Sequence, residues 1–243
     1  MARLRFVEID LRPPLPSPKT LAGWRKEAPE GFTFAAVAPP TLYGDPTWPL
    51  RDEARTRSEL DRMMNNAKAL AARVVVFRTP MAVTPGSVAL RRLQATLERA
   101  RKLAPEGSLV VWEPSGLWEH AEAVTAVRDQ GVTVACDPLH TTLGDQPLVY
   151  GRLRGLGVEQ RYDAAKLEDL VAALAGTPEV YVVFQSAAGW AEAVALARAT
   201  GTLVGEAADD TDGDGDEDGE DGEDFDDEDG EGFDDEDGDG DEG

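Results

Sequence analysis

The last thirty-five residues of this chain constrain its fold more than any other segment. Residues 209–243 hold 23 aspartates and glutamates, no lysine or arginine, and two large apolar side chains, Phe225 and Phe233. Like charges at this density repel one another, and two aromatic rings cannot build a hydrophobic core. We therefore expect this acidic tail to stay disordered and any folded core to come from the residues before it.

The charge of the chain divides at the same place. Of the 47 acidic residues, 24 lie in residues 1–208, where they balance all 24 lysines and arginines. The net charge of −23 therefore belongs to the acidic tail. We predict one domain over residues 1–205, long enough to bury a core, and a disordered acidic segment over residues 206–243.

Composition also predicts the environment of the protein. The single cysteine, Cys136, cannot form an internal disulfide, and no apolar run approaches the roughly 20 residues of a membrane span. The N-terminus lacks the pattern of a secretory signal. We expect a cytoplasmic protein with no membrane contact. Residues 1–205 contain no basic patch with interleaved aromatic residues, so we expect no direct nucleic-acid binding.

Short β-branched runs alternate with stretches of helical period along residues 5–204. Most runs are apolar on both faces, which is typical of parallel strands covered by helices. We expect strands at 5–11, 32–37, 74–78, 109–113, 132–137, 148–154 and 180–185. We expect helices at 18–28, 53–72, 84–103, 117–130, 164–175 and 188–199. Ser17 and Asp163 are the expected N-caps of the first and fifth helices, and Thr84 with Pro85 is expected to open the third.

This alternation predicts an α/β fold with a parallel sheet. Two architectures satisfy it, a TIM-type (β/α) barrel and an open doubly wound sheet, and the pattern alone does not separate them. The glycine-rich turn and the phosphate-loop motif that would favour a nucleotide-binding open sheet are both absent.

Charged residues gather at the carboxyl ends of the expected strands. If the apolar face of each strand meets the helices, alternation turns these charges toward the inside of a barrel, at the end where barrel enzymes carry their chemistry. The residues concerned are Glu8, Asp10, Arg78, Glu113, Asp137, Arg152 and Arg154. One hypothesis is a plug of ion pairs that neutralises itself. The other hypothesis is a site for a small anionic or phosphorylated ligand.

The ordered series of segments resembles the YecE-like family, also called domain of unknown function 72. The matching stretches are FVEID, VVVFRTPMAVTPGS, LVVWEPSGLW, GVTVACDP, LVYGRLRGLG and EVYVVFQS. The resemblance covers nearly all of residues 5–204 and implies a TIM-barrel fold. Family members begin with a strand and a helix before the segment that holds Glu8 here. The resemblance therefore implies about seven strands here, with the first strand of the family lacking. It also implies either a start codon further upstream or a gap that residues 1–5 and a neighbouring loop cover.

Several polar positions depart from the family pattern. Where the family carries Lys, Gln, Arg, His and paired Asn, this chain carries Val37, Arg78, Ser115, Arg154 and the pair Gln185 and Ser186. The family residues that remain are Glu8, Glu113, Asp137, Tyr150, Arg152 and Tyr162. The pattern indicates a relative that keeps the fold and has lost the family's own activity, which favours a non-enzymatic role.

The alternative is an enzyme or an anion-binding protein that works at the strand ends. Its candidate catalytic carboxylates are Glu8, Glu113 and Asp137, acting as acid or base. Its candidate ligand contacts are Arg78, Tyr150, Arg152, Arg154 and Tyr162. We expect no cofactor and no metal. Asp137 and His140 offer two ligands, whereas a catalytic zinc site takes three protein ligands.

The acidic tail contains one imitation of a metal site. Asp210, Asp212 and Asp214 resemble the start of an EF-hand loop, but the twelfth position is Asp221 and no helix flanks it, so specific calcium binding is not expected. The tail has two candidate roles, solubility and contact with a basic protein partner. For the second role, the rings in its repeated Phe-Asp-Asp-Glu-Asp-Gly are candidate anchors.

Overall fold

The computed structural model describes residues 4–203, apart from residues 13, 46–48, 52, 144–146 and 156–160. The disorder and the roles predicted for the acidic tail lie outside the described residues and stay predictions.

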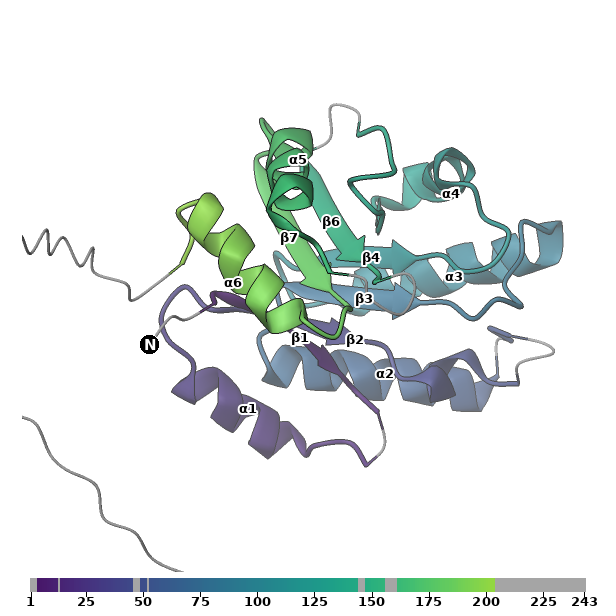
Figure 1. The fold of residues 1–243 in the computed structure, drawn as a ribbon. Coiled ribbons are helices and arrows are strands. Elements are labelled where there is room, and N and C mark those ends of the chain that lie inside the picture. The colour runs from purple at the N-terminus through teal and green to yellow at the C-terminus, as the bar shows by residue number, and fades with distance from the viewer. Residues whose placement is uncertain are drawn as a thin grey trace, which may run out of the picture. The chain divides into compact units, whose positions relative to one another are not determined.

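Strands and helices alternate through the described part of the chain, except that β6 follows β5 in the element order without a helix between them (Figure 1). The strands are β1 (Phe6–Asp10), β2 (Thr33–Val37), β3 (Val74–Arg78), β4 (Leu109–Glu113), β5 (Thr133–Val134), β6 (Leu148–Leu153) and β7 (Glu179–Phe184). The α-helices are α1 (Pro18–Glu27), α2 (Ala54–Ala69), α3 (Ser87–Leu103), α4 (His120–Val127), α5 (Ala164–Leu174) and α6 (Gly189–Ala199). Two 3-10 helices, η1 (Pro40–Tyr43) and η2 (Arg128–Gln130), complete the order. The predicted α/β class is confirmed.

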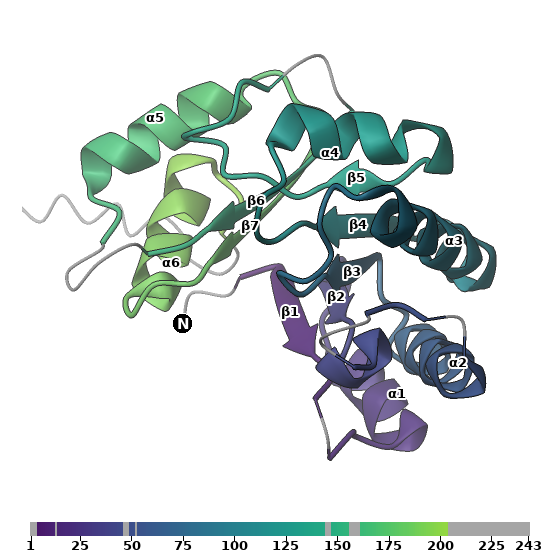
Figure 2. The ribbon, with the colours of Figure 1, turned by 90° about the vertical axis from the view of Figure 1, so that its right-hand side faces the viewer.

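All strand pairs are parallel and follow chain order. β1 to β5 form one sheet, β6 and β7 form a second, and a bridge between Cys136 and Gly151 joins the two. The strands curl around a common centre, with the helices on the outside (Figure 2). Within the described residues no strand pair joins β7 to β1. The parallel sheet is thus confirmed, and closure into a barrel stays a prediction.

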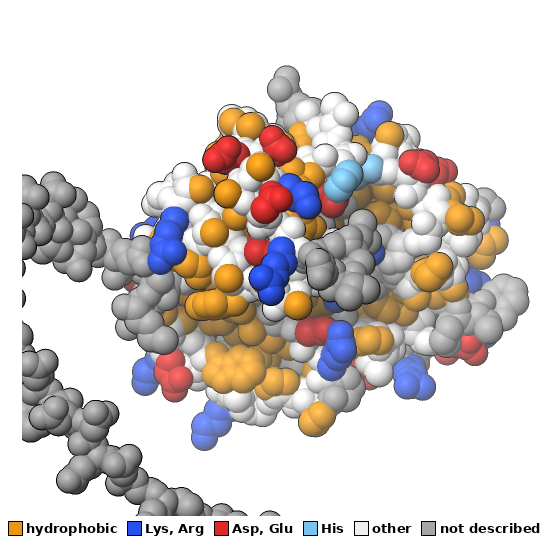
Figure 3. Space-filling model, in the orientation of Figure 1, with side chains coloured by type: hydrophobic (Ala, Val, Ile, Leu, Met, Phe, Trp, Pro, Cys, Tyr) orange, Lys and Arg blue, Asp and Glu red, His pale blue; other side chains and the backbone are white. Residues whose placement is uncertain are grey.

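The two faces of the curled sheet carry different side chains, as strand alternation requires. Large side chains on the outer face share a core with the helices, among them Val75, Phe77, Val110 and Trp112. Smaller side chains form a separate inner core together with Tyr150: Ala35, Val37, Val74, Val76, Val111 and Ala135. On the surface, acidic and basic side chains are interspersed over the face shown in Figure 3.

An ion pair connects β3 and β7 at their amino ends. Arg73, directly before β3, donates from Nη2 to both carboxylate oxygens of Glu179 at 3.0 Å. The Tyr181 hydroxyl donates to the same carboxylate at 2.7 Å, and its ring centroid lies 4.9 Å from that of Phe6 in β1. These contacts hold the two sheets together at one end, which brings the carboxyl ends of the strands around one centre.

Two predicted boundaries were wrong for local reasons. The third helix begins at Ser87 instead of near Thr84, because the chain bends where the Gly86 amide donates to the Thr84 carbonyl. β5 is much shorter than the predicted 132–137 because the chain changes partner there. The Ala135 amide still donates to β4, whereas the Cys136 amide donates to β6.

Three other helix ends differ from prediction by a few residues. The fourth helix begins at His120 instead of residue 117, and its last turn is η2. The second helix ends at Ala69 instead of residue 72. The N-caps predicted for the first and fifth helices are confirmed. The Ser17 side chain accepts a hydrogen bond from the Thr20 amide, and the Asp163 side chain accepts one from the Lys166 amide.

Candidate functional site

Six polar side chains from four strands meet near the carboxyl ends of the sheet. We call them the strand-end cluster: Glu8, Arg78, Glu113, Tyr150, Arg152 and Arg154. They come from β1, β3, β4 and β6, with Arg154 directly after β6. The sequence predicted that these side chains would converge, and the structure places them in contact.

Arg152 lies at the centre of the strand-end cluster. Its guanidinium donates to both carboxylate oxygens of Glu8, with Nη1 at 3.1 Å from Oε1. Its Nε lies 2.7 Å from Oε2 of Glu113. The Tyr150 hydroxyl also donates to Glu8, at 2.5 Å. Burial raises the pKa of Tyr150 far above its usual range, and the Glu8 carboxylate raises it further, so this hydroxyl stays a neutral donor.

Glu113 is surrounded by three guanidinium groups. Besides Arg152, it accepts from Nη2 of Arg154, and its Oε2 lies 3.1 Å from Nε of Arg78. The strand-end cluster therefore holds three positive and two negative charges. One guanidinium charge is left without its own carboxylate.

Two aromatic rings behind Glu113 hold the end of β4 in place. Trp112 is fully buried, and its indole Nε1 donates to the Thr79 hydroxyl at 3.0 Å. The Trp118 indole donates to the Val83 carbonyl at 2.7 Å, and the two rings pack edge to face with centroids 5.0 Å apart. Trp112 belongs to the outer core and Trp118 packs against it, and together the two rings fix the strand from which Glu113 projects.

Two of the predicted acids lie elsewhere. Asp10 was expected inside, but it is exposed at the last residue of β1, where it pairs with Arg12 at 2.7 Å. Asp137 is separate from the ion-paired cluster, and both of its oxygens are engaged. One accepts from the Leu139 amide at 3.0 Å, and the other lies 3.0 Å from Nδ1 of His140.

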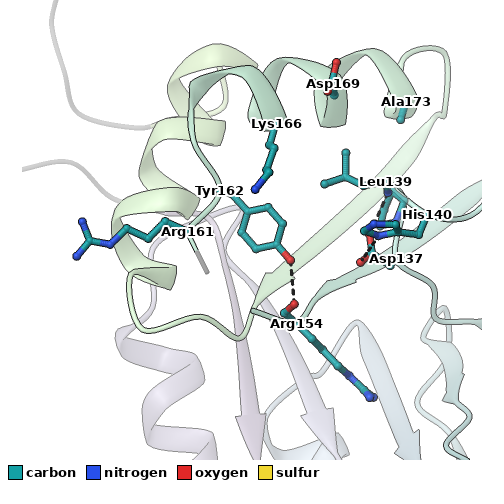
Figure 4. A pocket seen from close by; sticks show the side chains of 10 residues that line it. Asp137, Leu139, His140, Arg154, Arg161, Tyr162, Lys166, Asp169 and Ala173 are labelled. Atoms are coloured by element: carbon teal, nitrogen blue, oxygen red, sulfur yellow. Dashed lines mark hydrogen bonds and ion pairs between the residues drawn. The ribbon is translucent and has the colours of Figure 1, made fainter. Parts of the chain in front are cut away.

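Asp137 lines a pocket of about 540 Å³ between the strand ends and α5. The residues of this β5–α5 pocket that matter here are Asp137, Leu139, His140, Arg154, Tyr162 and Lys166 (Figure 4). The Tyr162 hydroxyl donates to the Arg154 carbonyl at 3.1 Å. The side chain of Arg154 turns away from the pocket, toward Glu113 (Figure 4). Arg154 therefore links the pocket to the strand-end cluster.

Sequence reasoning missed two residues that belong to this region. Tyr43, at the end of η1, is buried, and desolvation followed by the field of Glu113 raises the pKa of its hydroxyl far above the usual range. Glu192, a buried acid on α6, accepts from the Tyr162 amide at 2.8 Å and from the Ser186 hydroxyl. A signal existed for Tyr43, which follows the end of a strand. No such signal existed for Glu192, because its position in the sequence pattern predicts an exposed residue on the polar face of a helix.

The described part of the chain contains neither a metal-binding cluster nor a membrane-spanning helix. There, no group of three or more His, Cys, Asp or Glu side chains is placed to hold a metal ion. Likewise, among these residues no helix combines the length and the apolar character needed to cross a bilayer. The expected absence of a cofactor and the predicted compartment stay predictions.

Comparison with known proteins shows the family of this chain. A family model described as protein of unknown function DUF72 matches residues 3–218. The chain belongs to the DUF72 family. The resemblance inferred from the strand segments is thereby confirmed. No curated protein matches this DUF72 member significantly.

Solved structures support the fold of this DUF72 member. A crystal structure of a DUF72 family protein from Enterococcus faecalis V583 superposes with a TM-score of 0.62 at 15% identity, covering 81% of this chain and 90% of that one. A second crystal structure of the same Enterococcus faecalis protein gives a TM-score of 0.61 at 14% identity, covering 80% of this chain and 84% of that one. At such identities the likeness extends to the fold alone.

Proposed function

We propose that this DUF72 member binds a small anion at the rim of the strand-end cluster. The observation that carries the proposal is the surplus of one guanidinium charge, described above. Arg152 is enclosed, with 2% of its side chain exposed, whereas the side chains of Arg78 and Arg154 are 33% and 51% exposed. A ligand from solvent can therefore reach Arg78 and Arg154, and the positive charge in excess of the two carboxylates is available to it there.

A planar or tetrahedral oxyanion suits this rim. Guanidinium groups bind carboxylate and phosphate oxygens through paired N–H donors, and such charge-assisted bonds are stronger than neutral ones. A bound anion would take Arg154 from Glu113, which keeps Arg78 and Arg152 as partners. Lys166 and Tyr162 stand at the adjoining β5–α5 pocket, so the remainder of a small ligand would extend there.

The same geometry favours binding over catalysis. A general base must accept a proton from its substrate. Glu8 accepts hydrogen bonds from Arg152 and Tyr150, and Glu113 accepts one from Arg154. The buried Oε2 of Glu113 accepts no hydrogen bond, but it lies 3.1 Å from Nε of Arg78 and 2.7 Å from Nε of Arg152, so both carboxylates are already engaged by cations. This supports the inference, drawn from the altered family positions, that the family's own activity has been lost.

A thermal-shift assay tests the anion site. Inorganic phosphate, sulfate and small dicarboxylates should raise the melting temperature, since a ligand at ten times its Kd stabilises by about 1.4 kcal/mol. Arg154→Gln should abolish the shift, while Arg12→Gln, an exposed arginine paired outside the cluster, should keep it. Equal shifts in both variants would reject the site.

We also propose that the curled sheet is a TIM-type barrel of about seven strands. The parallel order β1 to β7, the separate inner core and the contact between Phe6 and Tyr181 support it. Amide hydrogen exchange tests closure: protection of β7 amides as strong as that of β3 amides would support a closed barrel, and fast exchange along β7 would contradict it.

A second candidate function belongs to the acidic tail, which concentrates the entire net charge of the chain. Such a segment suits solubility or contact with a basic protein partner. Deletion of residues 209–243 should abolish capture of the chain by a lysine-rich bait protein. Unchanged capture after the deletion would exclude the tail as the binding element.

A further inference from the structure

An arginine-lined groove runs between α2 and α3, on the outer side of the sheet. The two helices lie side by side there (Figure 2). The groove has a volume of about 490 Å³ and is lined by five arginines: Arg51, Arg57, Arg91, Arg92 and Arg99. Among its described lining residues there is no acid and no aromatic ring. We call it the arginine groove.

The helices on either side give this surface a strong positive surplus. α2 and α3 together carry nine lysines and arginines and three acids. Each of the three acids pairs with a base of the same two helices: Glu59 with Arg62, Asp61 with Arg99, and Glu98 with Lys102. Directly before α2, Arg51 pairs with Glu53 at 3.5 Å, so two of the five arginines of the groove, Arg51 and Arg99, share their charge with an acid. Residues 1–208 are neutral as a whole, so this surface holds charge that the rest of the domain balances elsewhere.

The arginine groove also offers apolar contact. Leu50 and Leu60 are buried beneath it, and Val88 at its side is 48% exposed, one of the few large apolar residues left open to solvent. A ligand that combined carboxylates with one apolar side chain would satisfy both features. A stacked nucleic-acid base would find no aromatic partner in this lining.

We propose that the arginine groove binds an acidic peptide segment that carries an aromatic residue among its carboxylates, presented by another molecule. The ring would contact Val88, and the flanking carboxylates would pair with the arginines. Phe-Asp-Asp-Glu-Asp-Gly, which this chain contains at residues 225–230 and 233–238, has this chemistry and provides the probe. The inference is independent of the anion site at the strand ends.

The test uses the full-length chain and a fluorescein-labelled peptide of residues 223–238, followed by fluorescence anisotropy. We expect saturable binding that weakens severalfold when the salt concentration rises from about 50 to 200 mM. Arg51→Glu with Arg91→Glu should weaken binding at least about tenfold, because two of the five cations are reversed. A peptide with both phenylalanines replaced by alanine should bind severalfold more weakly.

The matched control reverses two exposed lysines of α1, Lys19→Glu with Lys26→Glu, which changes the net charge by the same amount. It should bind the peptide as the unaltered chain does. Equal loss in both double variants, with melting temperatures unchanged, would show a response to net charge and overturn the proposal. Tighter binding of a twelve-nucleotide oligothymidylate, which matches the eleven acids of the peptide in charge, would also overturn it in favour of nucleic acid.

Discussion

Arg152 is the residue on which the strand-end cluster depends. Arg152→Ala would leave Glu8 and Glu113 enclosed without their shared cation, and removing one partner of a buried pair costs about 3–5 kcal/mol. We expect that loss in the free energy of unfolding measured with urea. Arg12→Ala, at an exposed pair, should change it by less than about 1 kcal/mol. A similar small change for Arg152→Ala would mean that the cluster is open to water.

Cys136 is predicted to be unreactive in the folded protein. Burial, aided by the Asp137 carboxylate, raises the pKa of its thiol from 9.0 to about 11, so the thiolate fraction near pH 8 falls about a hundredfold. Alkylation by iodoacetamide should therefore be slow at pH 8, accelerate as the pH approaches 11, and become fast in urea at either pH. Rapid labelling of the native protein at pH 8 would contradict the burial.

For single residues, the sequence predicted which face of a strand a side chain occupies better than it predicted which residue that side chain pairs with. Alternation was enough to turn Glu8, Arg78 and Glu113 to one face, because a strand leaves two choices per side chain. It could not predict that Asp10 would pair with Arg12 in solvent, since the curl of the sheet decides where an edge residue is exposed. The contacts of Glu192 with Tyr162 and Ser186 could not be predicted either, because they depend on how α6 packs against the loops that hold these two residues.

The backbone just after the end of α2 is strained, and a single substitution should relieve this strain. Ala71 adopts a left-handed φ of 49°, and the Ala72 amide closes the helix onto the Ala67 carbonyl. This position favours glycine, because a Cβ costs about 1–2 kcal/mol there. Ala71→Gly should stabilise the protein by about 0.5–1 kcal/mol in thermal or urea unfolding. Ala95→Gly, in the exposed interior of α3, should destabilise it by about 1 kcal/mol. Destabilisation by both would contradict the assigned backbone.

Element boundaries were predictable where burial is uniform. β3 and β4 match their predicted limits because helices cover one face and the inner core the other, which gives an unbroken apolar run. β5 was overestimated because its apolar run continues past the point where its backbone changes partner. At that junction a Cβ on Gly151 would lie 3.0 Å from Pro138, a close approach that no sequence pattern indicates.

For the whole molecule, charge and hydrophobic burial lie in different parts of the chain. The buried core lies between Leu11 and Ala197, whereas the acidic tail contributes two rings and 23 carboxylates. A chain ending at Ala208 should therefore keep its melting temperature within about 2 °C by differential scanning calorimetry. A chain ending at Ala188, which lacks α6 with its buried Glu192 and Leu196, should fail to fold cooperatively. A large fall in the melting temperature after removal of the acidic tail alone would show that the tail stabilises the domain.

The most direct measurement is a crystal structure of the full chain soaked in selenate, whose selenium is located by anomalous scattering. We expect an anomalous peak between the guanidinium groups of Arg78 and Arg154, with Arg152 still paired to Glu8 and Glu113. An empty rim at saturating selenate, or an Arg152 side chain turned away from both carboxylates, would contradict it.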